Sequence, residues 1–129
     1  MKEIRIYIAS PYTKGDVAVN VRESMWAFHR ILDLNSSFKN LSLVPHCPLL
    51  YHFLHIIKPR AYSEWLNLDL SWVKTCNVLV RLPGESKGAD EEERYAEKNH
   101  ILTVKGMTEL FNYLSEVNER EERNEIRAT

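Results

Sequence analysis

The chain begins with an alternation of isoleucine and other residues. Isoleucine occupies every second position from residue 4 to residue 8, and this period of two is typical of a strand. A polar segment, residues 9–16, follows and ends the strand. From Val17 to about Leu34 apolar residues recur at helical spacing, which predicts an amphipathic helix packed on a sheet, with Asp16 as its N-cap.

Further strands and helices alternate along the rest of the chain. Three strands are predicted at residues 41–44, where Pro45 closes the strand, 77–82 and 100–104. Three helices are predicted at residues 63–74, with Ser63 as the N-cap, 90–99 and 107–117. This alternation predicts an α/β protein with a flavodoxin- or Rossmann-like three-layer fold and a mostly parallel sheet of four to five strands. Residues 1–118 are expected to form one domain, and residues 119–129 a charged C-terminal tail that extends the last helix and frays.

The segment 49–57 is apolar on nearly all sides. This pattern predicts a short helix or loop that is buried by more than one neighbour, another subunit among them, and that ends at Lys58 and Pro59.

Composition narrows the classes of function. The chain has 129 residues and a formal net charge of -1, so no basic stripe points to polymeric nucleic acid, and a small-molecule ligand is favoured. The apolar runs are too short to span a bilayer, and the N-terminus has the pattern of a strand rather than of a signal peptide. We therefore expect a cytoplasmic protein without a membrane partner.

The candidate metal ligands do not form a known pattern. Cys47 and Cys76 are far apart in the sequence and are expected to be buried reduced thiols. The set of Cys47 with His46, His52 and His55 matches no closed four-ligand zinc spacing. Residues 13–16 lack the longer glycine frame of a P-loop. We expect no metal and no cofactor.

The richest chemistry follows the strand at 77–82. Gly84, Ser86 and Gly88 offer backbone donors of the kind that hold an anion, and the acidic run 90–93 falls at a helix start. This loop therefore offers an anion cradle together with a nucleophile or base. The alternative is an ordinary acidic helix start on a solvated face.

Two residues outside this loop are further candidates. Tyr7 lies near the end of the first strand, where it could also be only a packing aromatic of the sheet. Asp69 lies between Leu68 and Leu70. An ionised carboxylate among apolar residues is costly unless it is paired or faces a cavity. The alternative for Asp69 is a solvent-facing position.

Three ordered motifs resemble the nucleoside 2-deoxyribosyltransferase superfamily, including its nucleotide N-glycosidase branch and related small domains. They are Ile6–Pro11, Leu68–Trp72 together with Cys76–Val80, and Ser86–Glu92. The resemblance spans roughly residues 4–104. It implies a flavodoxin-like fold, a homodimer or larger homo-oligomer, and cleavage or transfer at the N-glycosidic bond of a nucleoside or nucleotide.

The resemblance also implies roles for single residues. Glu92 matches the family's nucleophile, Asp69 the carboxylate that helps the base to depart, and Tyr7 the tyrosine that orients the nucleophile. Substrate contacts are implied for Ala9, Ser10, Ser86, Lys87 and Gly88.

One of these contacts bears on the substrate. Ser86 stands six residues before Glu92, where the monophosphate branch carries serine and the nucleoside branch aspartate. The resemblance therefore favours a nucleoside 5′-monophosphate, because a neutral hydroxyl beside backbone donors accepts a phosphate that a carboxylate would repel.

The chain departs from the family pattern on both sides of the implied nucleophile. Asp90 and Arg94 replace two glycines, and their bulk and charge are expected to narrow the pocket. If the helix begins one residue differently, Glu91 or Glu93 is the inward carboxylate instead. Two non-enzymatic alternatives stay open, namely a nucleotide-binding or sensing domain on the same fold and an interaction module built on the segment 49–57.

Overall fold

The computed structural model describes residues 1–128, except for the side chains of residues 50–53. Its strands are β1 (Lys2–Ala9), β2 (Leu41–His46), β3 (Val78–Arg81) and β4 (Leu102–Lys105). They form one four-stranded sheet in the order β2-β1-β3-β4, and every neighbouring pair is parallel. The α/β three-layer fold and the parallel sheet expected from the sequence are confirmed.

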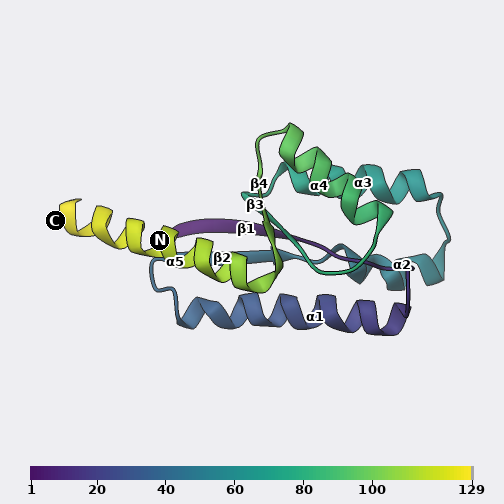
Figure 1. The fold of residues 1–129 in the computed structure, drawn as a ribbon, viewed down its shortest axis with the longest axis horizontal. Helices are drawn as coiled ribbons and strands as arrows, with labels where there is room; N and C mark the ends of the chain where they lie inside the picture. The colour runs from purple at the N-terminus through teal and green to yellow at the C-terminus, as the bar shows by residue number, and fades with distance from the viewer. Residues whose placement is uncertain (129) are drawn as a thin grey trace.

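Helices cover both faces of this sheet (Figure 1). They are α1 (Val17–Asp33), α2 (His52–Ile57), α3 (Tyr62–Lys74), α4 (Lys87–Lys98) and α5 (Gly106–Ala128), with short 3-10 turns at Leu34–Ser36 (η1) and Pro48–Tyr51 (η2). One hydrophobic core lies between the sheet, α1 and α5, and a second lies between the sheet, α3 and α4. The layers are therefore helix, sheet and helix.

The alternation in β1 distributes its side chains between these two cores. Ile4, Ile6 and Ile8 belong to the core with α1 and α5, whereas Tyr7 and Ala9 belong to the core with α3 and α4. Successive side chains of a strand point to opposite faces of the sheet. Tyr7 is thus brought to the face on which α4 lies.

The strand order reverses at β1. The chain passes from β1 outward to β2 and then returns to the other side of β1 as β3. In open parallel sheets such a switch point opens a crevice at the carboxyl ends of the strands. The loops that follow β1 and β3, at residues 10–16 and 82–86, meet at this crevice. Gly84 makes their contact possible, because its φ is 118° and a Cβ atom there would lie 2.7 Å from Cγ of Pro11.

Several predicted boundaries need correction. Pro45 lies inside β2 rather than closing it, since an edge strand tolerates a missing backbone donor. Ser63 lies within α3, whose N-cap is Ala61. Helix α4 begins three residues earlier than predicted, because the Ser86 hydroxyl accepts a hydrogen bond from the Ala89 amide (3.1 Å) and caps it. The predicted cap of α1 is confirmed, as Asp16 accepts from the Val19 amide.

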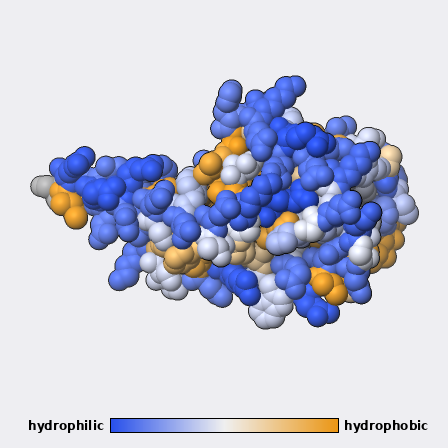
Figure 2. Space-filling model, viewed as in Figure 1, coloured by the Kyte–Doolittle hydropathy of each residue, from blue (hydrophilic) through white to orange (hydrophobic). Residues whose placement is uncertain are grey.

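The segment 49–57 was predicted less well than the helical extension at the C-terminus. The segment 49–57 forms η2 and α2, but Leu54, Ile56 and Ile57 are exposed, so this chain alone does not bury it. The side chains of residues 50–53 lie outside the described residues. Helix α5 continues without a break across residues 118 and 119 to Ala128. Its C-terminal part projects from the body of the molecule and is mostly hydrophilic (Figures 1 and 2).

Candidate active site

A cavity of about 300 Å³ lies at the carboxyl ends of β1 and β3. The loop after β1, η2, α2, α3 and the first half of α4 form its walls. Its volume matches the lower end of the range for small-molecule sites. Of the residues predicted from sequence, Ser10, Asp69, Ser86, Gly88 and Glu92 line this cavity. Residues separated widely in the chain therefore meet in one place.

Glu92 occupies a core-facing position on α4. It follows Ala89 and precedes Ala96 on the buried stripe of the helix, and only 5% of Glu92 is exposed. Residues three and four apart on a helix share a face. The buried face of α4 therefore carries a carboxyl group at a position where proteins usually have an apolar residue. The hydroxyl of Tyr7, which is fully buried on β1, donates a hydrogen bond to Oε2 of Glu92. The sheet therefore orients this carboxyl group.

Asp69 brings a second carboxyl group to the cavity from α3. Its Oδ1 atom is buried and has no hydrogen-bond partner among the described residues. Burial raises the pKa of Asp69 to about 7, because a carboxylate loses its hydration in an apolar environment. The predicted cavity-facing position is found, and the solvent-facing alternative is wrong.

The environment of Glu92 raises its pKa to about 8. Burial is the largest cause, and the charges of Asp69 and Glu91 act in the same direction. The Tyr7 hydrogen bond and the charge of Arg81 oppose it. The charge of Asp69 disfavours ionisation of Glu92, so near neutral pH the two carboxyl groups do not both carry a negative charge.

We expect Glu92 to make the free energy of unfolding fall as pH rises. Its folded pKa of about 8 lies above the ordinary value of 4.5, so the folded state binds the proton more tightly than the unfolded state. This stabilisation is full below pH 4.5 and is lost as pH rises through the folded pKa, at about 1.4 kcal/mol per pH unit. Denaturant unfolding across this range should show a smaller fall for Glu92→Gln than for Glu91→Gln. Equal slopes in the two variants would contradict the assignment.

The neighbouring glutamates on α4 are turned away from the cavity wall. Glu91 accepts a hydrogen bond from the Tyr62 hydroxyl (3.2 Å). Glu93 bonds Arg81 and Lys105 and lines a separate pocket with them. The alternatives that Glu91 or Glu93 is the inward carboxylate are therefore not supported by the geometry, and Glu92 holds that position.

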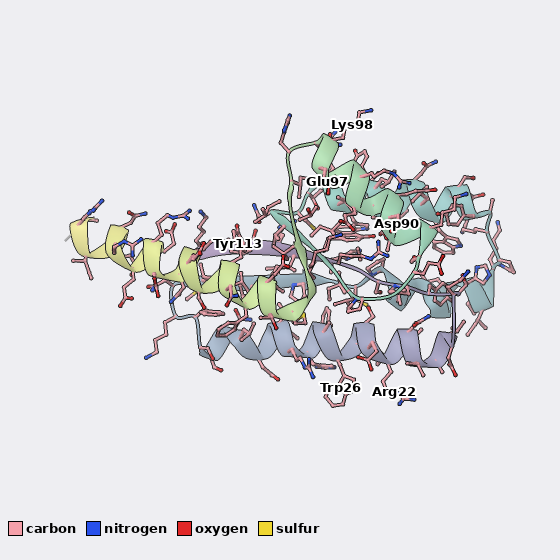
Figure 3. The ribbon with its side chains drawn as sticks, in the orientation of Figure 1. Arg22, Trp26, Asp90, Glu97, Lys98 and Tyr113 are labelled. Atoms are coloured by element: carbon pink, nitrogen blue, oxygen red, sulfur yellow. The ribbon has the colours of Figure 1, made fainter. Side chains whose placement is uncertain are left out.

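Asp90 and Arg94 do not narrow the cavity, contrary to expectation. Each lies two positions from Glu92, about 200° around the helix. Asp90, which lies near the start of α4 (Figure 3), forms an ion pair with Arg81 (2.6 Å), and Arg94 is exposed. The side chains that replace two glycines of the family that this sequence resembles thus do not line the cavity.

The predicted substrate-binding residues occupy different positions. Ser10 is 7% exposed, and its hydroxyl has no hydrogen-bond partner among the described residues. Lys87 lies with Lys14 in a groove that adjoins the cavity. Ser86 and Gly88 line both the groove and the cavity. Ala9 is fully buried and does not line the cavity. The substrate contact expected of Ala9 is therefore not found. Instead, the Ala9 carbonyl accepts a hydrogen bond from the Leu82 amide (2.8 Å) and joins β1 to the loop after β3.

Aromatic side chains that belong to none of the sequence motifs also line the cavity. Tyr12, Tyr62 and Trp65 line the cavity, as does Arg60. Tyr62, Trp65 and Asp69 follow each other on α3 at spacings of three and four, which places them on one face of the helix. This spacing is visible in the sequence, but only the position of the cavity shows that the face is turned inward.

Of the histidines and cysteines considered as metal ligands, His46 has an aromatic neighbour, and both cysteines are buried. His46 stacks on Trp72, with ring centroids 4.6 Å apart, and Cys47 and Cys76 are buried free thiols, as predicted. The side chain of His52 lies outside the described residues. Among the side chains that are described, no three His, Cys, Asp or Glu residues cluster as metal ligands would.

In the described part of the chain, no helix combines the length and apolar character needed to cross a membrane.

Comparisons of this chain with models of protein families, with curated proteins and with solved structures find no match. A function of this chain is therefore inferred from the cavity and its side chains.

Proposed function

We propose that the protein cleaves or transfers the N-glycosidic bond of a nucleoside, with a nucleoside 5′-monophosphate as the favoured substrate. The observation that carries the proposal is the carboxyl group of Glu92, buried at the wall of the cavity, oriented by Tyr7 and facing the same space as Asp69. A pair of carboxyl groups at the substrate is the arrangement with which most glycoside hydrolases cleave the glycosidic bond.

The two carboxyl groups have complementary roles in this reaction. The carboxylate of Glu92 attacks C1′ of the sugar, a C–O bond forms and the C–N bond to the base breaks. The base departs with the electron pair of that bond and takes a proton from Asp69. Water or a second free base then attacks C1′, returns the proton to Asp69 and releases Glu92. Two displacements at C1′ give net retention of configuration.

The raised pKa of Asp69 suits its role, because burial keeps the acid protonated closer to neutral pH. Glu92 must instead be ionised to attack. Positive charge develops on the sugar ring as the base departs, and this charge attracts the carboxylate and favours its ionised form. The hydrogen bond from Tyr7 acts in the same direction.

The substrate class follows from the groove beside the cavity. Ser86 and Gly88 belong to both, and Lys14 and Lys87 lie along the groove. The first amides of α4 and the Lys87 ammonium group attract an anion at this end. The Lys14 ammonium group forms an ion pair with Glu85 of the same groove (3.6 Å). The Ser10 hydroxyl, buried and without a hydrogen-bond partner among the described residues, is a further donor for a ligand. We therefore expect the 5′-phosphate to bind at this end while C1′ lies next to Glu92.

Product analysis tests both parts of the proposal. Purified protein would be incubated with ribo- and deoxynucleosides and with their 5′-monophosphates, with and without an added free base, and the products separated by chromatography. We expect release or exchange of the base, faster with the monophosphates than with the nucleosides. Lys87→Ala should reduce this difference, whereas Lys98→Ala, at the far end of α4, should not. Equal rates for both classes would contradict the preference for phosphate.

One observation favours a second candidate function. Burial raises the pKa of Glu92 to about 8, so the group that should attack keeps its proton at neutral pH. A nucleotide-binding or sensing domain would use such a protonated carboxyl group only to hydrogen-bond its ligand. Binding of a nucleotide without turnover, measured by calorimetry, would favour the sensor.

A further inference from the structure

Arg81 does not line the cavity and lies in a separate pocket with Asp90 and Glu93 of α4. It is the last residue of β3, and its side chain is only 10% exposed. Its guanidinium donates to the carbonyl oxygens of Gly84 (2.8 Å) and Leu82 (3.2 Å) in the loop that follows the strand. A guanidinium presents several donors in a rigid plane, so one side chain can hold this loop at more than one point.

The same side chain also holds the helix that carries Glu92. Arg81 contacts Oδ1 of Asp90 (2.6 Å) and Oε1 of Glu93 (3.5 Å), and Lys105 on β4 binds the other oxygen of Glu93. Glu93 is 9% exposed, and partly buried charge pairs of this kind are screened less than exposed ones. The first two turns of α4 are thereby tied to the ends of β3 and β4.

We propose that Arg81 is a positioning residue for Glu92. Through the loop carbonyls and the two α4 carboxylates it fixes the orientation of the carboxyl group that faces the cavity, without touching the substrate. Its place in catalysis depends on the proposed function. Its effect on Glu92 does not.

The charges around Glu92 give this arrangement a second consequence. Tyr7 from β1, Asp69 from α3 and Glu91 from α4 itself act on Glu92 together with Arg81. Arg81 is the cation of this set, and its charge lowers the pKa of Glu92 against the effect of burial. The neighbouring Glu93 offsets part of that charge through their ion pair. Loss of Arg81 and loss of Glu93 should therefore move the pKa of Glu92 in opposite directions.

Direct titration of Glu92 tests the proposal. Proteins with ¹³C-labelled glutamate side chains would be titrated by NMR, with the Glu92 signal assigned by its absence in Glu92→Gln. We expect the pKa of Glu92 to rise by about one unit in Arg81→Gln, as an opposite charge nearby is lost, and to fall in Glu93→Gln. Arg94→Gln, which removes an exposed arginine from the same helix, should leave it unchanged. An unchanged pKa in Arg81→Gln, or shifts in the same direction in both variants, would overturn the proposal.

A conservative variant separates charge from positioning. Arg81→Lys keeps the positive charge but cannot bind the loop carbonyls and both carboxylates together. We expect it to leave the pKa of Glu92 closer to wild type than Arg81→Gln does, while the amide signals of residues 84–90 shift in both. Where Arg81→Gln does not fold, Arg81→Lys and Glu93→Gln carry the test. Unshifted amides in Arg81→Lys would overturn the positioning role.

The titration needs no substrate, so its failure differs from failure of the proposed function. If the pKa shifts occur but no base is released from any nucleotide, the proposed reaction is wrong and the inference about Arg81 stands. If the wild type releases base, Arg81→Gln should reduce its kcat/KM below pH 7, because a smaller fraction of Glu92 is ionised there when its pKa rises. An unchanged kcat/KM below pH 7 would overturn the inference alone.

Discussion

Replacement of Glu92 by glutamine is expected to reduce base release by at least about 10³-fold. The amide has nearly the shape of the carboxyl group, so its carbonyl can still accept the hydrogen bond from Tyr7, but it cannot form the ester with C1′. Folding should be preserved, because the variant removes an ionisable group that is only 5% exposed. Turnover of a 5′-monophosphate, measured by chromatography of the released base, gives the result.

The matched control for this variant is Glu91→Gln on the same helix. Glu91 bonds the Tyr62 hydroxyl instead of facing the cavity wall. Its replacement should change turnover by less than about fivefold, because a side chain that does not touch the reacting atoms stabilises the transition state little. The reverse result, an inactive Glu91→Gln and an active Glu92→Gln, would show that Glu91 is the nucleophile. Nucleotide binding by both variants would show that the cavity is intact.

Replacement of Asp69 by asparagine is expected to reduce turnover by about 10²- to 10⁴-fold, the usual contribution of a positioned general acid. The amide has nearly the shape of the acid and cannot supply a proton. The loss should be much smaller with a substrate whose base departs readily as an anion, because such a base does not need the proton. Comparison of kcat for the two kinds of leaving group therefore tests the role of Asp69 within one variant.

The pH profile provides a second test of the same variant. Turnover of the wild type should fall at high pH as Asp69 loses the proton that it must donate. Asp69→Asn should lack this basic limb and keep the acidic one, which belongs to Glu92. A variant with an unchanged profile and an equal loss for both leaving groups would mean that Asp69 only shapes the cavity.

The fold could be predicted from the sequence wherever one local pattern determines the outcome. The alternation in β1 assigns its side chains to two faces, and the Asp16 cap marks the start of α1, as the structure confirms. The start of α4 was missed because the acidic run beginning at Asp90 is also typical of a helix start. Ser86, four residues before Asp90, forms the cap, and the short polar sequence between them does not distinguish the two possible helix starts.

The candidate site could be predicted only in part. Glu92, Asp69 and Tyr7 were expected near one another, and the structure brings them together. Arg81 was not singled out, because its importance depends on loop carbonyls and carboxylates that only the folded chain brings together. The exposed residues Ile56 and Ile57 of α2 show a related limit, since a hydrophobic pattern predicts burial without specifying what covers it.

Mass spectrometry of the protein during turnover tests the central claim most directly. A reaction with a nucleoside 5′-monophosphate would be quenched in acid, and the intact protein and its peptides weighed. We predict a mass increase of one sugar phosphate on the peptide that contains Glu92, absent from Glu92→Gln and unaffected by Glu91→Gln. Base release by the wild type with no adduct at Glu92, or with an adduct at another residue, would contradict the role of Glu92 as nucleophile.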